Sequence, residues 1–329
     1  MKERHFRNKI IVATFILDIL VILTHSQKPA ALAGEQVTQI AVPGFFLISG
    51  YLFFRNLTLK SIPGKWIKRL RSVVVPYLLW NLIYFAGYLI LTNIPAISRF
   101  IGVAPIQFNV QNLLEAIFLY KYNPVFWFIF QLILLFALSP VIYILVKNMY
   151  VGIVYLIALL TALYLGYDLS IVNTDAVFYY SFAAFLAQHL SEMFEKDAWL
   201  EKENGNKKGL IGGALLIFAS IVFFFVAGAT GKVFYLVLLR ISAVLGGWII
   251  LPMMNLFEAR DYMKNSFLIY AMHFAIVRFI NKAGAALLPH TSFFEYLIFF
   301  ISPVIVFAVV AVLAKPIRKY LPALNGFRM

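Results

Sequence analysis

The sequence predicts an all-α, polytopic membrane protein, a transmembrane bundle of about ten helices. The chain of 329 residues is 63% hydrophobic and only 13% charged, whereas a soluble domain carries about 25% charged residues. Its mean hydropathy is +0.88. Its apolar runs are too long for the roughly ten-residue alternating strands of a membrane barrel. In a bilayer every backbone N–H and C=O must be bonded internally, and helices achieve this.

The hydrophobic segments are each close to the length that a spanning helix needs, about 17–25 residues. They cover residues 10–27, 37–54, 72–92, 125–146, 150–167, 175–191, 209–227, 233–256, 266–287 and 294–314. No internal repeat and no low-complexity tract interrupts them, so we expect one membrane domain over residues 1–329.

Basic residues gather in alternate loops. Four lie before residue 10, six between 55 and 71, and four after 314; the segments predicted to face inside hold 21 of the 28 in all. This asymmetry predicts that both termini are cytoplasmic. It also explains most of the net charge of +14 without a nucleic-acid partner. The basic start, the apolar run and the small residues near 30–33 are similar to a signal peptide, but Asp18 inside the run favours a retained helix.

Several classes of chemistry find no support in the sequence. The chain has no cysteine, which excludes a disulfide framework, a thiolate metal site and a cysteine nucleophile. There is no phosphate-binding loop, no zinc-protease HExxH and no serine-hydrolase GxSxG. We expect no bound metal.

The first predicted span carries an unusual polar stripe. Asp18 and His25 are seven residues apart, so they share a helical face, and Thr14 lies on the same face. An ionisable residue at membrane depth costs about 2.5–3.5 kcal/mol on insertion scales, which makes it a functional candidate. His25 falls near the outer end of the span, where a plain interfacial histidine is the alternative.

A second candidate is the basic run that contains Lys68, Arg69 and Arg71 and precedes the third span. The plain interpretation is a flanking topology signal. The functional interpretation is a clamp for phosphates, because arginine offers paired donors that match phosphate oxygens.

Two arginines and a histidine fall inside the late spans. Arg240, His273 and Arg278 must each face the bundle interior or an aqueous cavity. Arg240 is a candidate ion-pair partner of Asp18 or a substrate-binding residue, and the residues alone leave both possibilities open.

The order of several short stretches resembles the acyltransferase family 3 membrane proteins, over nearly the whole chain. The stretches are Leu20–Ser26 with His25, Val42–Tyr51 with Ser49 and Gly50, Lys68–Trp80, Phe126-Trp127-Phe128 with Leu138–Pro140 downstream, and Ser266–His273. Three positions depart from the family pattern. Thr14 stands where a basic residue is usual, Lys68 and Arg71 only partly match R-x-x-R, and Phe130 replaces a common arginine.

The resemblance implies an integral-membrane O-acyltransferase of the cell membrane, surrounded by lipid, with acetyl as the expected group. Acetyl-CoA would be the cytosolic donor, and a surface glycan or its lipid-linked precursor the acceptor. The alternative function is a transporter or flippase that uses the intramembrane charges as a pathway, and an inactive scaffold is a third.

The resemblance also implies roles for individual residues. His25 would be catalytic, either as a general base or through a transient acyl-imidazole. Lys68, Arg69 and Arg71 would bind the donor. The supporting residues would be Asp18, Ser49, Trp127, Arg240 and His273.

Overall fold

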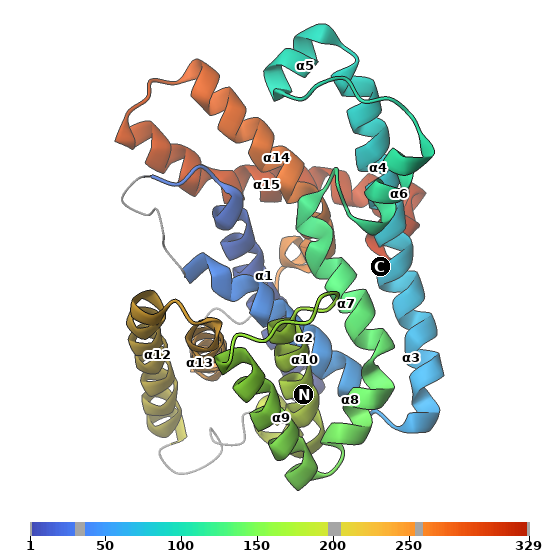
Figure 1. The fold of residues 1–329 in the computed structure, drawn as a ribbon. Coiled ribbons are helices and arrows are strands. Elements are labelled where there is room, and N and C mark those ends of the chain that lie inside the picture. Colours follow the sequence, from blue (N-terminus) through green and yellow to red (C-terminus); the bar gives the residue numbers. More distant parts are fainter. Residues whose placement is uncertain (1, 30–36, 197–204, 254–258, 328–329) are drawn as a thin grey trace. The chain divides into compact units, whose positions relative to one another are not determined.

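A computed structural model describes residues 2–29, 37–196, 205–253 and 259–327 (Figure 1). These residues form helices joined by short loops, and no strand occurs in the described part of the chain. The all-α class expected from composition is confirmed.

The chain divides into two compact units. The first unit comprises residues 1–20, 36–65 and 134–264, and the second comprises 21–35, 66–133 and 265–329. Three helices, α1 (Lys2–His25), α3 (Ile62–Arg69) and α7 (Trp127–Ala137), run from one unit into the other.

The first unit contains most of the chain's middle. Its helices are α2 (Ala41–Phe54), α8 (Ser139–Val146), α9 (Met149–Tyr164), α10 (Thr174–His189), α11 (Ser191–Lys196), α12 (Gly205–Thr230) and α13 (Val233–Ile250). Short 3-10 turns cover Val37–Ile40, Leu59–Ser61, Leu251–Met253 and Asp261–Asn265, the last of which ends at the first residue of the second unit.

The second unit holds the outer loop and the last two long helices. Its helices are α4 (Val75–Thr92), α5 (Pro95–Ile101), α6 (Val110–Phe118), α14 (Ser266–Leu287) and α15 (Ser292–Tyr320). Two 3-10 turns cover Pro124–Phe126 and Pro322–Asn325. Before α4, helix α3 (Ile62–Arg69) continues into a π-helical turn over Leu70–Val74.

Four helical runs in the described residues are long and apolar enough to cross a membrane, namely Leu59–Thr92, Gly205–Thr230, Val233–Met253 and Ser292–Tyr320. A fifth results if Pro124–Ala137 and Ser139–Val146, which meet at a bend of 61°, form one span. The expected number of ten is therefore not confirmed. Several predicted spans fold as shorter helices: α2 has 14 residues, and α9 and α10 have 16 each.

Glycines set the closest helix contacts of the first unit. A Cβ at Gly50 of α2 would lie 3.0 Å from the backbone oxygen of Tyr180 in α10. Helices α12 and α13 lie side by side (Figure 1), and a Cβ at Gly246 would lie 2.9 Å from the backbone oxygen of Gly213. Small residues permit this approach in membrane bundles, where packing rather than hydrophobicity joins the helices. The close packing of α2 on α10 therefore explains why position 50 of the Ser49-Gly50 stretch is a glycine.

The π-helical turn before α4 has a cause in the sequence. Pro76 has no N–H to donate to the carbonyl four residues back, so the regular ladder cannot continue. The bonding shifts to a longer ring, in which the Val75 N–H bonds the Leu70 carbonyl. The C-terminal turn packs here: a Cβ at Gly326 would lie 2.5 Å from the Ser72 carbonyl oxygen, and φ at Gly326 is +61°. Both features demand glycine.

Candidate active site

Two histidines meet in the second unit. His25 is the last residue of α1, and His273 lies in the second turn of α14. Their ring centroids are 5.3 Å apart with an interplanar angle of 45°. His25 is half-buried, and His273 is 0% exposed. The sequence singled out both residues but gave no reason to place them together.

The ring of His273 is held by main-chain carbonyls. Its Nδ1 lies 2.7 Å from the Tyr270 oxygen and 3.2 Å from the Ile269 oxygen. Since a carbonyl only accepts, Nδ1 carries the hydrogen, and in the neutral imidazole Nε2 is then an acceptor. That Nε2 is buried and has no hydrogen-bond partner among the described residues. A buried acceptor without a donor is unusual and marks a site that a ligand or a proton can complete.

Asn281 of α14 fixes the end of α1. Its side-chain Nδ2 donates to the His25 carbonyl at 3.0 Å, and its Oδ1 accepts from the Gln27 N–H at 3.0 Å. The last carbonyls and the following N–H of a helix end need such partners. One amide therefore holds the backbone on both sides of Ser26 and positions His25. Sequence reasoning missed Asn281, because an asparagine in a helix carries no periodic signal.

Tyr270 packs against aromatic side chains of another resembling stretch. Phe126 stacks on it at 6.0 Å and Phe128 meets it edge-on at 5.5 Å. Tyr77 stacks on Phe126 at 5.8 Å. The Tyr270 hydroxyl donates to the Val125 carbonyl. The packing supports the turn of α14 whose carbonyls hold His273. Trp127 lies half-buried between the two phenylalanines in sequence.

Helix α4 adds a further tie to the same turn. The Tyr84 hydroxyl donates to the Ala271 carbonyl at 2.9 Å. Because Tyr84 follows Arg71 by 13 residues, the two positions are separated by about 20 Å of helix. The basic run therefore lies about 20 Å along the helix from Tyr84, the residue of α4 that contacts the turn of His273.

The predicted donor clamp lies near the start of the segment 66–133, which belongs to the second unit. Lys68 and Arg71 are exposed, and Arg69 is half-buried. Lys68 and Arg71 have no carboxylate within ion-pair distance among the described residues. Lys65, by contrast, belongs to the first unit and donates to the carbonyls of Phe53 and Arg55, at the C-terminal end of α2. A cation at a helix C-terminus is a structural use.

Three of the predicted supporting residues, Asp18, Ser49 and Arg240, belong to the first unit, as does Thr14 of the polar stripe. Asp18 is 1% exposed in α1. The Thr14 hydroxyl donates to the carbonyls of Ile10 and Ile11, at 3.0 Å each. Ser49 is half-buried on α2. His25 and His273 belong to the second unit, so none of these residues shares a unit with the histidine pair.

The sequence leaves Arg240 as a candidate ion-pair partner of Asp18 or a substrate-binding residue, and in the structure its ion-pair partner is Asp175 instead of Asp18. Arg240 donates to Asp175 Oδ2 at 3.4 Å and to Gln39 Oε1 at 3.1 Å. Asp175 stands in the first turn of α10, where the helix dipole favours an acid. Helical faces in sequence cannot show which of two buried acids an arginine meets.

Sequence reasoning also missed an ion-pair network in the first unit. Arg55 donates from Nε and Nη2 to the two carboxylate oxygens of Glu195, each at 2.8 Å. The Tyr51 hydroxyl donates to Glu195 Oε1 at 2.8 Å, and Arg55 also pairs with Glu3. The hydrogen bonds to Glu195 raise the pKa of Arg55. This bidentate pair ties α1, α2 and α11 together.

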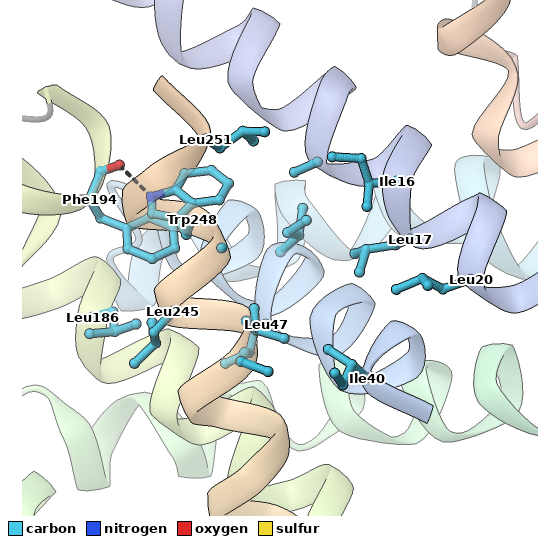
Figure 2. A pocket seen from close by; sticks show the side chains of 15 residues that line it. Ile16, Leu17, Leu20, Ile40, Leu47, Leu186, Phe194, Leu245, Trp248 and Leu251 are labelled. Carbon is cyan, nitrogen blue, oxygen red and sulfur yellow. Dashed lines mark hydrogen bonds between the residues drawn. The ribbon is translucent and has the colours of Figure 1, made fainter. Parts of the chain in front are cut away.

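The first unit encloses an apolar cavity of about 210 Å³ (Figure 2). Ile16, Leu17 and Leu20 of α1 and Leu47 of α2 point toward it. Trp248 closes one end, and its indole N–H donates to the Phe194 carbonyl at 3.2 Å. The lining offers no acid, base or nucleophile, so this cavity has no chemistry of its own.

Among the described residues, no group of three or more His, Asp or Glu side chains lies close enough together to hold a metal ion.

Fold and site together define a helical membrane protein with a histidine pair at the end of its first helix. The sequence pattern of acyltransferase family 3, described as an acyltransferase domain, matches residues 8–314. The chain belongs to this family and is a membrane acyltransferase. The family thus favours the enzyme over the transporter alternative. Among curated proteins and among solved structures, none matches the chain.

Proposed function

We propose that the protein moves an acyl group, with acetyl as the expected one, from acyl-CoA to a hydroxyl of a surface glycan or its lipid-linked precursor. The observation that carries the proposal is the contact of His25 with His273, whose Nε2 is a buried acceptor without a partner. Such a pair offers both a nucleophilic nitrogen and a second proton-accepting site.

The donor would approach from the cytoplasmic side. Lys68 and Arg71 are exposed and have no carboxylate partner among the described residues, as a clamp for the CoA phosphates requires. The acyl thioester of CoA lies at the end of a long flexible arm, so the phosphates can stay at the clamp while the thioester reaches His25.

Two balanced routes lead to the product. In the direct route, an imidazole takes the proton of the acceptor hydroxyl and the oxygen attacks the thioester carbonyl. The carbon–sulfur bond breaks, and the imidazolium gives the proton to the departing CoA thiolate. In the stepwise route, the unprotonated ring nitrogen of His25 attacks the thioester carbonyl, the carbon–sulfur bond breaks, and the CoA thiolate leaves with the ring N–H proton. The acceptor oxygen then attacks the acyl carbon, the carbon–nitrogen bond breaks, and the hydroxyl proton returns to the imidazole. His273 serves either route as the neighbouring site for a proton.

The test is a comparison of His25→Ala with wild type and with His290→Ala. His290 is an exposed histidine of the same unit, which makes it a matched control. We expect His25→Ala to lower glycan acylation about 10²–10⁴-fold, the usual loss of a general base, at equal protein amounts in the membrane. The measurement is mass spectrometry of the surface glycans. Near-normal acylation in His25→Ala would refute the proposed site.

A further inference from the structure

The second unit contains a cavity of about 200 Å³ between α4, α5 and α14. Tyr84 and Tyr88 line it from α4, and Phe274, Arg278 and Lys282 line it from α14. Each set has four-residue spacing, which places its members on one helical face. The cavity is therefore built from two facing rows, one of tyrosines and one that carries two cations.

The two cations of this cavity meet only neutral groups. Arg278 Nη1 donates to the Tyr88 hydroxyl at 3.0 Å, and Lys282 Nζ donates to the Phe100 carbonyl at 3.2 Å. Neither has a carboxylate within ion-pair distance among the described residues. Elsewhere Arg55, Arg240 and Lys121 each have an acidic partner.

The surroundings provide no neutralising charge either. The second unit has twelve basic residues and three acidic ones. Two half-buried cations in a membrane protein, without an acid to pair with, are costly unless an anion joins them. The cavity is thus prepared for a negatively charged ligand.

The cavity adjoins the histidine pair through Phe274. This ring lines the cavity, and its centroid lies 5.5 Å from that of His25, edge to face. The size suits one substituted six-membered ring, since an apolar cavity of about 150 Å³ holds benzene. Aromatic walls and tyrosine hydroxyls suit a sugar, which presents both C–H faces and hydroxyls.

We infer that this cavity binds the acceptor, and that the acceptor sugar unit is anionic, bearing a carboxylate or a phosphate that Arg278 and Lys282 neutralise. This rests on the proposed function for the identity of the cavity as an acceptor site. The donor phosphates are assigned to the basic run about 20 Å away along α4, so the two substrates have separate cation groups.

The experiment uses the purified full chain in lipid nanodiscs with acetyl-CoA and three acceptor probes. These are methyl glucoside, methyl glucuronide and glucose 1-phosphate, which are neutral, carboxylated and phosphorylated. The variants are Arg278→Gln, Lys282→Gln and the double change. The control is Arg99→Gln, since Arg99 is an exposed arginine of α5 outside the cavity lining.

We expect wild type to prefer a charged acceptor. In the double variant the KM for that acceptor should rise about ten- to a hundredfold, the usual effect of losing charged hydrogen bonds. The KM for acetyl-CoA should stay unchanged, as should every constant of Arg99→Gln. The better of the two charged probes identifies the anion.

Two results would overturn the inference while leaving the proposed function intact. One is equal use of charged and neutral acceptors by wild type and variants; the other is a rise in the KM for acetyl-CoA alone, which would make the cavity a donor site. If wild type acylates none of the probes, the proposed function loses its support. Calorimetric binding of the three probes then decides the inference alone: charged sugars must bind wild type and not the double variant.

Discussion

At the scale of single residues, the pairing of His25 and His273 is the feature with the clearest chemical content. The Nδ1 of His273 is bonded to carbonyls and its Nε2 is available. Removing that nitrogen takes a proton acceptor from the site and leaves Arg278, Lys282 and the basic run unchanged.

We expect His273→Phe to lower kcat by about 10²-fold, the lower end of the range for general acid–base groups. The KM for acetyl-CoA should stay within a factor of two or so, because the donor clamp is remote. A kcat equal to that of wild type would show that His273 only packs.

Asn281 permits a graded test of positioning. Asn281→Leu removes both hydrogen bonds to the end of α1, whereas Asn281→Asp keeps the acceptor for the Gln27 N–H and loses the donor for the His25 carbonyl. We expect kcat to fall about thirtyfold in the first variant and about fivefold in the second, because each lost bond is worth about 1 kcal/mol.

For each Asn281 variant, the KM of both substrates and the melting temperature of the purified protein are measured beside kcat. If kcat falls while both KM values and the melting temperature stay constant, Asn281 positions His25. A parallel loss of melting temperature and activity in both variants would assign it to stability instead.

Individual residues show where sequence reasoning succeeds and fails. Asp18 and His25 stand out because a charge inside an apolar run is rare. The contact between His25 and His273 joins positions 248 residues apart, and no local pattern encodes it. Arg240 is a candidate partner of Asp18 in the sequence because both charges fall inside apolar spans, and the structure gives it Asp175 instead.

At the scale of elements, the run from α3 through the π-helical turn into α4 presents the basic cluster. The break follows from Pro76 and was visible in the sequence only as a proline. The exposure of Lys68 and Arg71 on the turn before it leaves both topology signalling and phosphate binding as uses for the cluster.

Changing Lys68, Arg69 and Arg71 together to Gln separates those uses. On the clamp interpretation the KM for acetyl-CoA rises about ten- to a hundredfold, with membrane insertion unchanged. The control is a triple change of Lys147, Lys207 and Lys208 to Gln, three exposed lysines of predicted inside segments. An unchanged affinity for CoA after the first triple change would leave only the topology role.

At the scale of the whole molecule, composition alone predicted the class. A chain with 63% hydrophobic residues cannot cover its surface with polar side chains, so the sequence predicted a helical membrane protein. The number of spans did not follow. Hydropathy windows join an apolar helix to the apolar loop beside it, and helices such as α2 and α9 prove shorter than the windows suggested.

Topology is a prediction at this scale. We expect a reporter that fluoresces only in the cytoplasm to be bright after either terminus and within residues 55–71, because basic residues concentrate there. The same reporter near His290, in the short loop between α14 and α15, should be dark. A dark C-terminal fusion would mean that the chain crosses the membrane an odd number of times.

The seat of Gly326 on the Ser72 carbonyl has a consequence for anyone who engineers this protein. The tail from Pro322 packs beneath the helix break, and the Trp80 indole N–H donates to the Leu324 carbonyl at 2.9 Å. A purification handle fused tightly after this tail would pull on the helix that displays Arg71. Donor affinity would then change although expression and folding looked normal. A long spacer, or a handle at the opposite end of the chain, avoids an artefact that would be mistaken for a catalytic effect.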